Sequence, residues 1–219
     1  MCTSYESSEY DRFEAFSLFS PPAFDYKREI YKDYVAPIFR RGADGFSTDP
    51  AAFGMMPRKR IPQGVKVFDT MNARAESVGQ KPSFSGAWKS LQVCLVPGAG
   101  VFEPNYETGK AVRWRIGMAS GKPLAIAGLW RAWEEPAGTS LSFTMLTVNS
   151  DTHSLMHRFH QPGDEKRSVV ILGQEEYGDW LGCRSTDEAR SFLQWYPADL
   201  MRAEAHPLPS RKSKVAAVG

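Results

Sequence analysis

The sequence predicts an α+β fold, a mainly antiparallel β-sheet with a few flanking helices, in a single domain. From about residue 90, short apolar or alternating runs are separated by Gly, Pro and Asn, which is typical of strands joined by turns. Helical patterns are confined to two short stretches. With 219 residues, of which 42% are hydrophobic and 24% charged, the chain is long enough for one sizeable core or at most two small ones.

The individual elements follow from these patterns in chain order. The first sixty-odd residues are rich in Pro, Gly and aromatic residues, which indicates loops and short strands packed on the rest of the fold. Helices are predicted at residues 151–160 and 185–196, and in the second of these Ser185 followed by Glu188 fits a capping box. Five strands are predicted, at residues 91–104, 111–116, 123–133, 140–148 and 167–172.

Composition also bears on where the protein works. The sequence has no apolar run of about 18 residues, and acidic residues occur where a secretory signal would have its apolar core. We therefore expect a cytoplasmic protein with no membrane partner. The cysteines Cys2, Cys94 and Cys183 are scattered and form no CxxC motif, which favours reduced thiols. Residues 1–204 are predicted to form the domain, and residues 205–219 a disordered basic tail.

The cysteine directly after the initiator methionine can have special chemistry. Removal of Met1 would leave Cys2 with a free α-amine beside its thiol, which is a 1,2-aminothiol. The amine can attack an aldehyde to give a Schiff base, and the sulfur can then close a five-membered thiazolidine ring. An α-amine is partly neutral, and therefore nucleophilic, at physiological pH. The alternative interpretation is that a cysteine at position 2 is an accident of the start-site sequence.

Two further segments combine polar residues in patterns that suit a site. In TMNARAES, the side chains of Asn72, Arg74 and Glu76 would share one face of an extended segment, which is either a solvated surface or a site. In CLVPGAGVFEP, a strand enters a Gly-rich turn and then presents Glu103 between a Phe and a Pro. Apolar surroundings adapt a carboxyl for acid–base work, although a buried structural ion pair fits the same pattern.

Three of the four histidines lie together in HSLMHRFH. On a helix, His153, His157 and His160 would share one face, so a metal site is one interpretation. No Cys or His elsewhere offers an obvious further ligand, and the other interpretation is one functional or buried histidine with two surface companions. We therefore expect neither a metal nor another cofactor.

Together these motifs resemble one family. The chain contains, in order and over nearly its whole length, Cys2 after Met1, NARAES, KPSF, CLVPGAGVFEP, AGLW, FTMLTVN and FHQPGDEKRSVVIL. It is identified as a member of the SRAP family, the SOS-response-associated peptidases, also called abasic-site-processing proteins. The resemblance implies a barrel-like β core. It also implies covalent capture of abasic sites in single-stranded DNA, through a thiazolidine between the mature N-terminal cysteine and the ring-opened sugar.

The resemblance also implies roles for single residues, and the sequence departs from the family pattern at two places. Many members have Gly-Arg after the cysteine, where this chain has Thr3 and Ser4. Members often have a Trp that wedges the DNA strand where this chain has Arg58 and Lys59. The implied roles are nucleophile for Cys2, orientation of the reactive terminus for Asn72, phosphate binding for Arg74, lining of the DNA backbone contact for Thr147, and proton transfer for Glu103 and His160.

DNA binding has to come from a local groove, because the formal net charge is only +2. We expect a monomer that binds single-stranded DNA. Three arginines from basic runs are candidates for a phosphate track: Arg40, Arg58 and Arg113. Four aromatic residues are candidates for base stacking: Phe53, Phe68, Trp88 and Trp114.

Two other function classes fit parts of the pattern. An N-terminal-nucleophile cysteine peptidase would act on itself or on other proteins without DNA, although the sequence has no Ser-His-Asp or Cys-His protease motif. A noncovalent single-stranded-DNA-binding module would contain Cys2 as a buried, structural residue.

Overall fold

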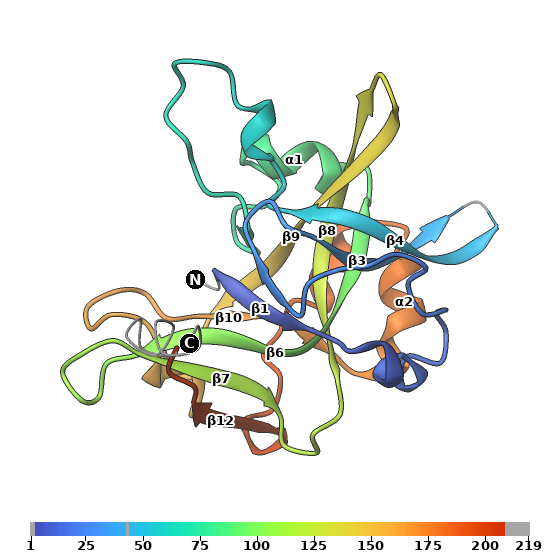
Figure 1. Cartoon of the computed structure of the whole chain (residues 1–219). Helices are drawn as coiled ribbons and strands as arrows, with labels where there is room; N and C mark the ends of the chain where they lie inside the picture. The colour runs from blue at the N-terminus through green and yellow to red at the C-terminus, as the bar shows by residue number, and fades with distance from the viewer. Residues whose placement is uncertain (1–2, 43, 209–219) are drawn as a thin grey trace, which may run out of the picture.

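The strands of this computed structural model, which describes residues 3–42 and 44–208, belong to one 12-stranded sheet whose central part closes into a barrel (Figure 1). Around the barrel, β8 pairs with β9, β9 with β4, β4 with β3, β3 with β6, and β6 again with β8. All these pairings are antiparallel except that of β4 with β9. The predicted fold class is confirmed. The five barrel strands are β3 (Val35–Gly42), β4 (Gly45–Phe53), β6 (Val93–Asn105), β8 (Leu124–Glu135) and β9 (Gly138–Asn149).

Strand β6 connects the barrel to a second group of strands. Its first half pairs with β8, and its second half pairs with β1 and β7. The Gly-rich turn predicted before Glu103 is wrong, because β6 runs through it without interruption. Gly100 allows this, since a Cβ there would lie 2.9 Å from the carbonyl oxygen of Ile116 on β7. The second group consists of β1 (Ser4–Ser7), β2 (Glu29–Tyr31), β7 (Val112–Met118) and β12 (Met201–Ala205).

Strands β3 and β4 correct the prediction of loops and short strands for this part of the chain. They form an antiparallel pair along their whole length, and Pro37 lies opposite Pro50. Arg40 is compatible with a barrel strand because its Nε lies 2.8 Å from Oδ2 of Asp49 on the partner strand. Residues that are typical of turns and surfaces therefore conceal two full strands.

Of three short strands near the candidate site, the first two pair with β9 and the third pairs with β8. They are β5 (Asn72–Arg74), β10 (Arg167–Val169) and β11 (Ile171–Leu172). Strand β5 pairs parallel with β9, so that Arg74 is opposite Thr147. Strand β10 pairs antiparallel with β9, so that Val169 is also opposite Thr147. Thr147 thus lies between the two short strands.

The helices are short, and none in the described part of the chain is long and apolar enough to cross a membrane. The predicted helix at 185–196 is confirmed over Thr186–Ser191 (α3), and the Ser185 hydroxyl accepts a hydrogen bond from the Glu188 N–H at 3.1 Å. The other helices are α1 (Pro82–Lys89), α2 (Tyr177–Leu181) and the 3₁₀ turns η1 (Tyr10–Ala15), η2 (Arg58–Arg60), η3 (Met156–Arg158), η4 (Gln174–Glu176) and η5 (Ala198–Leu200).

Two buried clusters follow from the alternation of side chains along the barrel strands. One draws side chains from all five barrel strands and includes Phe53 and Phe143, whose rings stack with centroids 5.1 Å apart. The other contains the buried faces of the helices, with Trp88 of α1 and Trp180 of α2. The indole N–H of Trp180 donates to the carbonyl oxygen of Cys94 at 2.8 Å, which fixes α2 to β6.

A substitution at Gly128 tests how tightly the barrel strands pack. A Cβ at Gly128 would lie 2.6 Å from the Thr144 carbonyl oxygen and 3.0 Å from Sγ of Cys94, so strand β8 would have to shift. We expect Gly128→Ala to destabilise the protein by about 1–3 kcal/mol, which a thermal melt would record as a drop of several degrees in Tm. Gly86→Ala is the control, because nothing lies within 4 Å of a Cβ there on α1. A Tm no lower for Gly128→Ala than for Gly86→Ala would contradict this.

Candidate active site

A buried acid and a buried histidine meet at the end of β6. The Nε2 atom of His160 lies 3.1 Å from Oε2 of Glu103, and the two side chains are 6% and 4% exposed. Their relative orientation is not that of an aligned hydrogen bond. Contacts between acid–base groups in active sites are often poorly aligned before substrate binds. The separation suits proton transfer between the two groups once either side chain turns slightly.

His160 reaches Glu103 because its loop is joined to the end of β6. Phe159 is fully buried and forms an antiparallel bridge with Asn105, whose side-chain amide donates to the Arg158 carbonyl oxygen at 3.1 Å. The His160 N–H donates to the carbonyl oxygen of Pro104 at 2.9 Å. The φ of His160 is 68°, a left-handed conformation that costs a non-glycine residue about 1–2 kcal/mol. The neighbouring contacts hold a strained residue in place, as is common at functional sites.

The predicted helix at 151–160 is wrong, and the three histidines do not share a face. Only the turn η3 forms there. Nδ1 of the buried His153 accepts the backbone N–H groups of Leu155 and Met156, at 3.1 and 2.9 Å, which competes with helix formation. His157 is exposed. Within the described residues, no group of three or more His, Cys, Asp or Glu side chains could hold a metal ion.

Asn72 and Arg74 lie on β5, next to the β9 strand. Asn72 is buried, whereas the Arg74 side chain is 48% exposed and its NH1 lies 2.7 Å from Oε2 of Glu165. Thr147 is only 1% exposed, and its hydroxyl contacts the Ala73 carbonyl oxygen at 3.5 Å. The Thr147 side chain is therefore buried against β5 and exposes no surface for direct contact with a DNA backbone.

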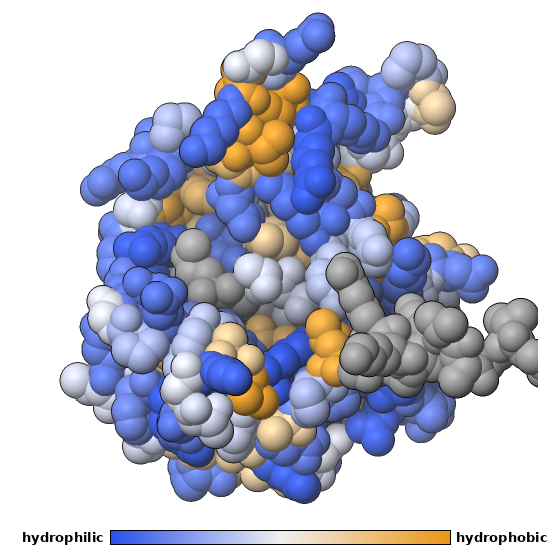
Figure 2. Space-filling model, turned by 60° about the vertical axis from the view of Figure 1, so that its left-hand side comes forward, coloured by the Kyte–Doolittle hydropathy of each residue, from blue (hydrophilic) through white to orange (hydrophobic). Residues whose placement is uncertain are grey.

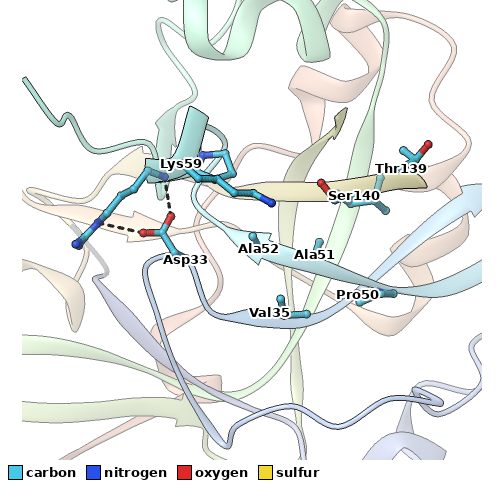
Figure 3. A pocket seen from close by; sticks show the side chains of 11 residues that line it. Asp33, Val35, Pro50, Ala51, Ala52, Lys59, Thr139 and Ser140 are labelled. Carbon is cyan, nitrogen blue, oxygen red and sulfur yellow. Dashed lines mark hydrogen bonds and ion pairs between the residues drawn. The ribbon is translucent and has the colours of Figure 1, made fainter. Parts of the chain in front are cut away.

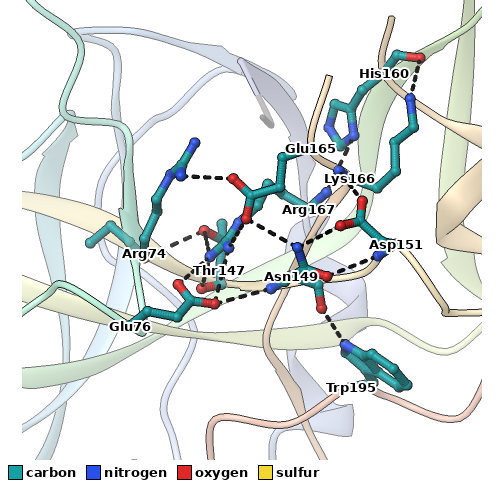
Figure 4. A network of polar contacts seen from close by, with 11 residues as sticks. Arg74, Glu76, Thr147, Asn149, Asp151, His160, Glu165, Lys166, Arg167 and Trp195 are labelled. Atoms are coloured by element: carbon teal, nitrogen blue, oxygen red, sulfur yellow. Dashed lines mark hydrogen bonds and ion pairs between the residues drawn. The ribbon is translucent and has the colours of Figure 1, made fainter. Parts of the chain in front are cut away.

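A polar network connects Arg74 with His160 through Arg167 (Figure 4). The guanidinium of Arg167 is 2% exposed and lies 2.8 Å from Glu165 and 2.9 Å from Glu76. It also donates to the Thr147 carbonyl oxygen at 2.7 Å. The backbone N–H of Arg167 points at Nδ1 of His160 at 3.4 Å, so the proton of a neutral imidazole would be on Nε2, toward Glu103.

Sequence reasoning missed Arg167 and Glu165, and it noted Glu76 only as part of a polar face. The available signal was the run DEKR immediately before the apolar strand SVVIL. Burial alone would raise the pKa of Glu165, but hydrogen bonds from Arg167 and Asn149 and the charge of Arg74 hold it below its usual value. Glu165 is therefore an anion at neutral pH.

Strand β1 lies beside the acid. Ser4 of β1 pairs with Phe102, the residue before Glu103. Cys2 lies outside the described residues. Cys94 and Cys183 are both buried free thiols. Burial raises the pKa of Cys183 to about 11 and raises that of Cys94 further, so neither is adapted to act as a nucleophile.

The three arginines predicted for a phosphate track are each paired with a carboxylate: Arg40 with Asp49, Arg58 with Asp33, and Arg113 with Glu29. Arg40 also lies over the Trp130 ring at 4.8 Å. Within residues 3–42 and 44–208, no hydrogen bond or ion pair joins any of the three to Arg74 or His160. The structure thus places each of the three in an ion pair of its own, and their role as a phosphate track stays a prediction.

A cavity of about 590 Å³ lies away from the Glu103–His160 pair, between β3, β4, η2 and the start of β9 (Figure 3). Its walls are mostly small apolar side chains such as Val35 and Ala51, with Asp33 holding Arg58 at 3.0 Å on one rim. It contains no histidine or cysteine. These walls could enclose a ligand, but the charged groups Asp33 and Lys59 are each already in an ion pair, with Arg58 at 3.0 Å and with Glu135 at 2.6 Å.

The candidate stacking residues differ sharply in exposure. Phe53 and Trp88 are buried, and Trp114 is partly buried against Phe159, whereas Phe68 is 41% exposed. Figure 2 shows an apolar patch at the top of the molecule, at the height where Figure 1 places the segment between η2 and β5. In that segment Val65, Val67 and Phe68 are exposed, and the chain continues directly into Asn72.

The comparisons with known proteins agree with one another. A family model described as SOS response associated peptidase (SRAP) matches residues 3–214. Over 139 residues the chain is 32% identical to the Abasic site processing protein YoqW and 31% identical to the Abasic site processing protein YobE, both of Bacillus subtilis (strain 168). Each match covers 62% of this chain, but only 59% of YoqW and 60% of YobE. The matched part therefore spans less than two thirds of these relatives.

Solved structures match over a longer part of the chain. A Bordetella bronchiseptica protein is 34% identical, with a TM-score of 0.84, and the match covers 94% of this chain and 100% of that one. A Bacteroides thetaiotaomicron protein is 21% identical, with a TM-score of 0.73, over 93% of this chain and 91% of that one. At this lower identity the second match shows the fold alone.

Proposed function

Because the chain belongs to the SRAP family, we propose that it processes abasic sites by capturing them covalently in single-stranded DNA. The names of YoqW and YobE support abasic sites as the substrate class. The observation that carries the proposal is the buried pair of Glu103 and His160, next to the place where Ser4 of β1 pairs with Phe102.

The proposed chemistry begins with the closed hemiacetal of the abasic sugar. Glu103 moves the proton that opens the ring to the aldehyde. The α-amine of Cys2, freed by removal of Met1, adds to the aldehyde carbon, and water leaves to give a Schiff base. His160 delivers the proton that the departing hydroxyl needs. The Cys2 sulfur then bonds to the same carbon and its proton passes to the nitrogen, which closes the thiazolidine without any oxidant or cofactor.

The surrounding residues have supporting roles in this proposal. Asn72, buried on β5, orients the reactive amine, and Arg74 binds a phosphate with its exposed guanidinium. Phe68 is the stacking candidate with an exposed ring. Thr147 acts indirectly, because it contacts Arg167 below the surface. The chain would act as a monomer in the cytoplasm.

A denaturing gel tests the proposal directly. Purified protein is incubated with a single-stranded oligonucleotide whose uracil has been excised, and the expected result is a shifted band that survives heating. A complex that dissociates at high salt, with no shifted band that survives heating, would indicate a noncovalent binding module instead. Turnover of peptides in the absence of DNA would indicate an N-terminal-nucleophile peptidase. The undamaged oligonucleotide is the matched control and should give no shifted band that survives heating.

A further inference from the structure

Arg74, to which we assign phosphate binding, already has an anionic partner. Its NH1 lies 2.7 Å from Oε2 of Glu165, at a place where 48% of the Arg74 side chain and 33% of the Glu165 side chain are exposed. Figure 4 shows the two side chains pointing toward each other from different elements. A phosphate that approaches this arginine from solvent therefore meets a guanidinium whose charge is already paired.

Glu165 is held in this position without the help of Arg74. Its other oxygen, Oε1, accepts hydrogen bonds from Arg167 at 2.8 Å and from the Asn149 side chain at 3.1 Å. Arg167 is itself buried and fixed by Glu76. When Arg74 moves, the carboxylate stays, because two of its partners are independent of Arg74. The Arg74 side chain is the more exposed member of the pair, so it is the one that can move away from its partner.

We propose that Glu165 competes with DNA phosphate for Arg74 and thereby keeps noncovalent binding weak. The proposal rests on the proposed function, since it takes Arg74 as a phosphate ligand and single-stranded DNA as the partner. Two anions on one guanidinium repel each other, and this penalty applies to damaged and undamaged DNA alike. An abasic site is retained by its covalent bond, whereas undamaged DNA leaves. Glu165 therefore shifts selectivity toward the lesion.

Replacing the carboxylate with an amide tests this competition. Glu165→Gln keeps a side-chain oxygen that can accept from Arg167 and Asn149, but it removes the charge. We expect it to bind an undamaged single-stranded oligonucleotide about 5- to 20-fold more tightly at low salt. The dependence of binding on salt should steepen by up to about one phosphate. Fluorescence anisotropy with a labelled oligonucleotide over a salt series measures both.

Glu204→Gln is the control. It makes the same change in charge and also removes an ion pair with an arginine, Arg202, but within the described residues it has no contact with Arg74 or Arg167. Its affinity should stay within about twofold of wild type. Glu165→Gln should give no gain when Arg74→Ala is also present. Equal gains in DNA affinity for the two Glu→Gln variants would show a general charge effect and overturn the proposal. A gain in affinity that persists when Arg74 is replaced by alanine would also overturn it.

A second variant covers the case in which circular dichroism shows Glu165→Gln to be unfolded. Glu165→Asp keeps the charge, but its side chain is shorter by one methylene and cannot reach Arg74 and Arg167 together. A smaller gain in affinity is expected, and no gain would overturn the proposal.

Crosslinking to uracil-excised DNA, measured in parallel, separates the two proposals. Wild-type crosslinking with no gain for Glu165→Gln rejects only the role of Glu165. A gain for Glu165→Gln without any crosslinking rejects only the capture. No binding by any variant rejects both.

Discussion

Cys2→Ala is expected to abolish the heat-stable crosslink to abasic DNA. The variant keeps a free α-amine, so it can still form a Schiff base, but without sulfur it cannot close the thiazolidine ring. The Schiff base hydrolyses on heating unless borohydride reduces it first. Denaturing gels with and without borohydride should therefore show a band only in the reduced sample.

Cys183→Ala is the control for this experiment. Its thiol is buried in the α2 region, with a pKa raised by burial to about 11, and should contribute nothing to capture. Crosslinking by Cys183→Ala should match that of wild type. A crosslink of Cys2→Ala that survives heat as well as the wild-type crosslink would refute the thiazolidine chemistry, whatever its effect on DNA binding.

His160 is where the second large effect is expected. We expect His160→Ala to slow single-turnover crosslinking by about 10²-fold, because one acid–base group in contact with Glu103 is lost. His160→Asn should be equally slow and should retain the fold, since asparagine tolerates the left-handed φ of 68° at this position. A quench-flow or manual time course of the crosslinked fraction measures the rate.

The neighbouring histidines provide the controls. His157→Ala should react at the wild-type rate, because its side chain is exposed and its Nδ1 lies 2.8 Å from the His153 carbonyl oxygen, away from Glu103. His153→Ala should lower the melting temperature, because His153 fixes the turn η3, and the folded variant should crosslink at close to the wild-type rate. A chelator should have no effect. Similar losses at all three histidines, reproduced by EDTA, would instead indicate a metal site.

The strands from residue 91 onward could be predicted because their alternation is local. What could not be predicted is which strands pair. The sequence of β6 does not show that its first half pairs with β8 and that Val101–Asn105 pairs with β7, since either partner strand could pair with either half. Strands β3 and β4 could not be recognised because Arg40 is acceptable in a barrel strand only when a carboxylate on the partner strand, here that of Asp49, pairs with it.

The site shows the same division between local and distant information. Glu103 and His160 could each be named from their motifs, but their contact depends on the bridge between Phe159 and Asn105. The helix predicted around His160 fails because the His153 ring takes backbone N–H groups that a helix would use. Arg167 escaped notice because an arginine at the end of a charged run such as DEKR is usually on the surface.

Strand β1 has a consequence for the speed of capture. The ends of a chain usually fray, but Ser4–Ser7 is buried and lies between β2 and β6, with Tyr5 0% exposed. The conformational freedom of this segment is therefore lost during folding and not when DNA arrives. A reactant held next to a bound partner behaves as if it were present at an effective concentration of up to about 10⁵–10⁸ M. In the proposed reaction, a nucleophile that is joined to this ordered strand would lose less conformational freedom on binding DNA than one on a frayed terminus.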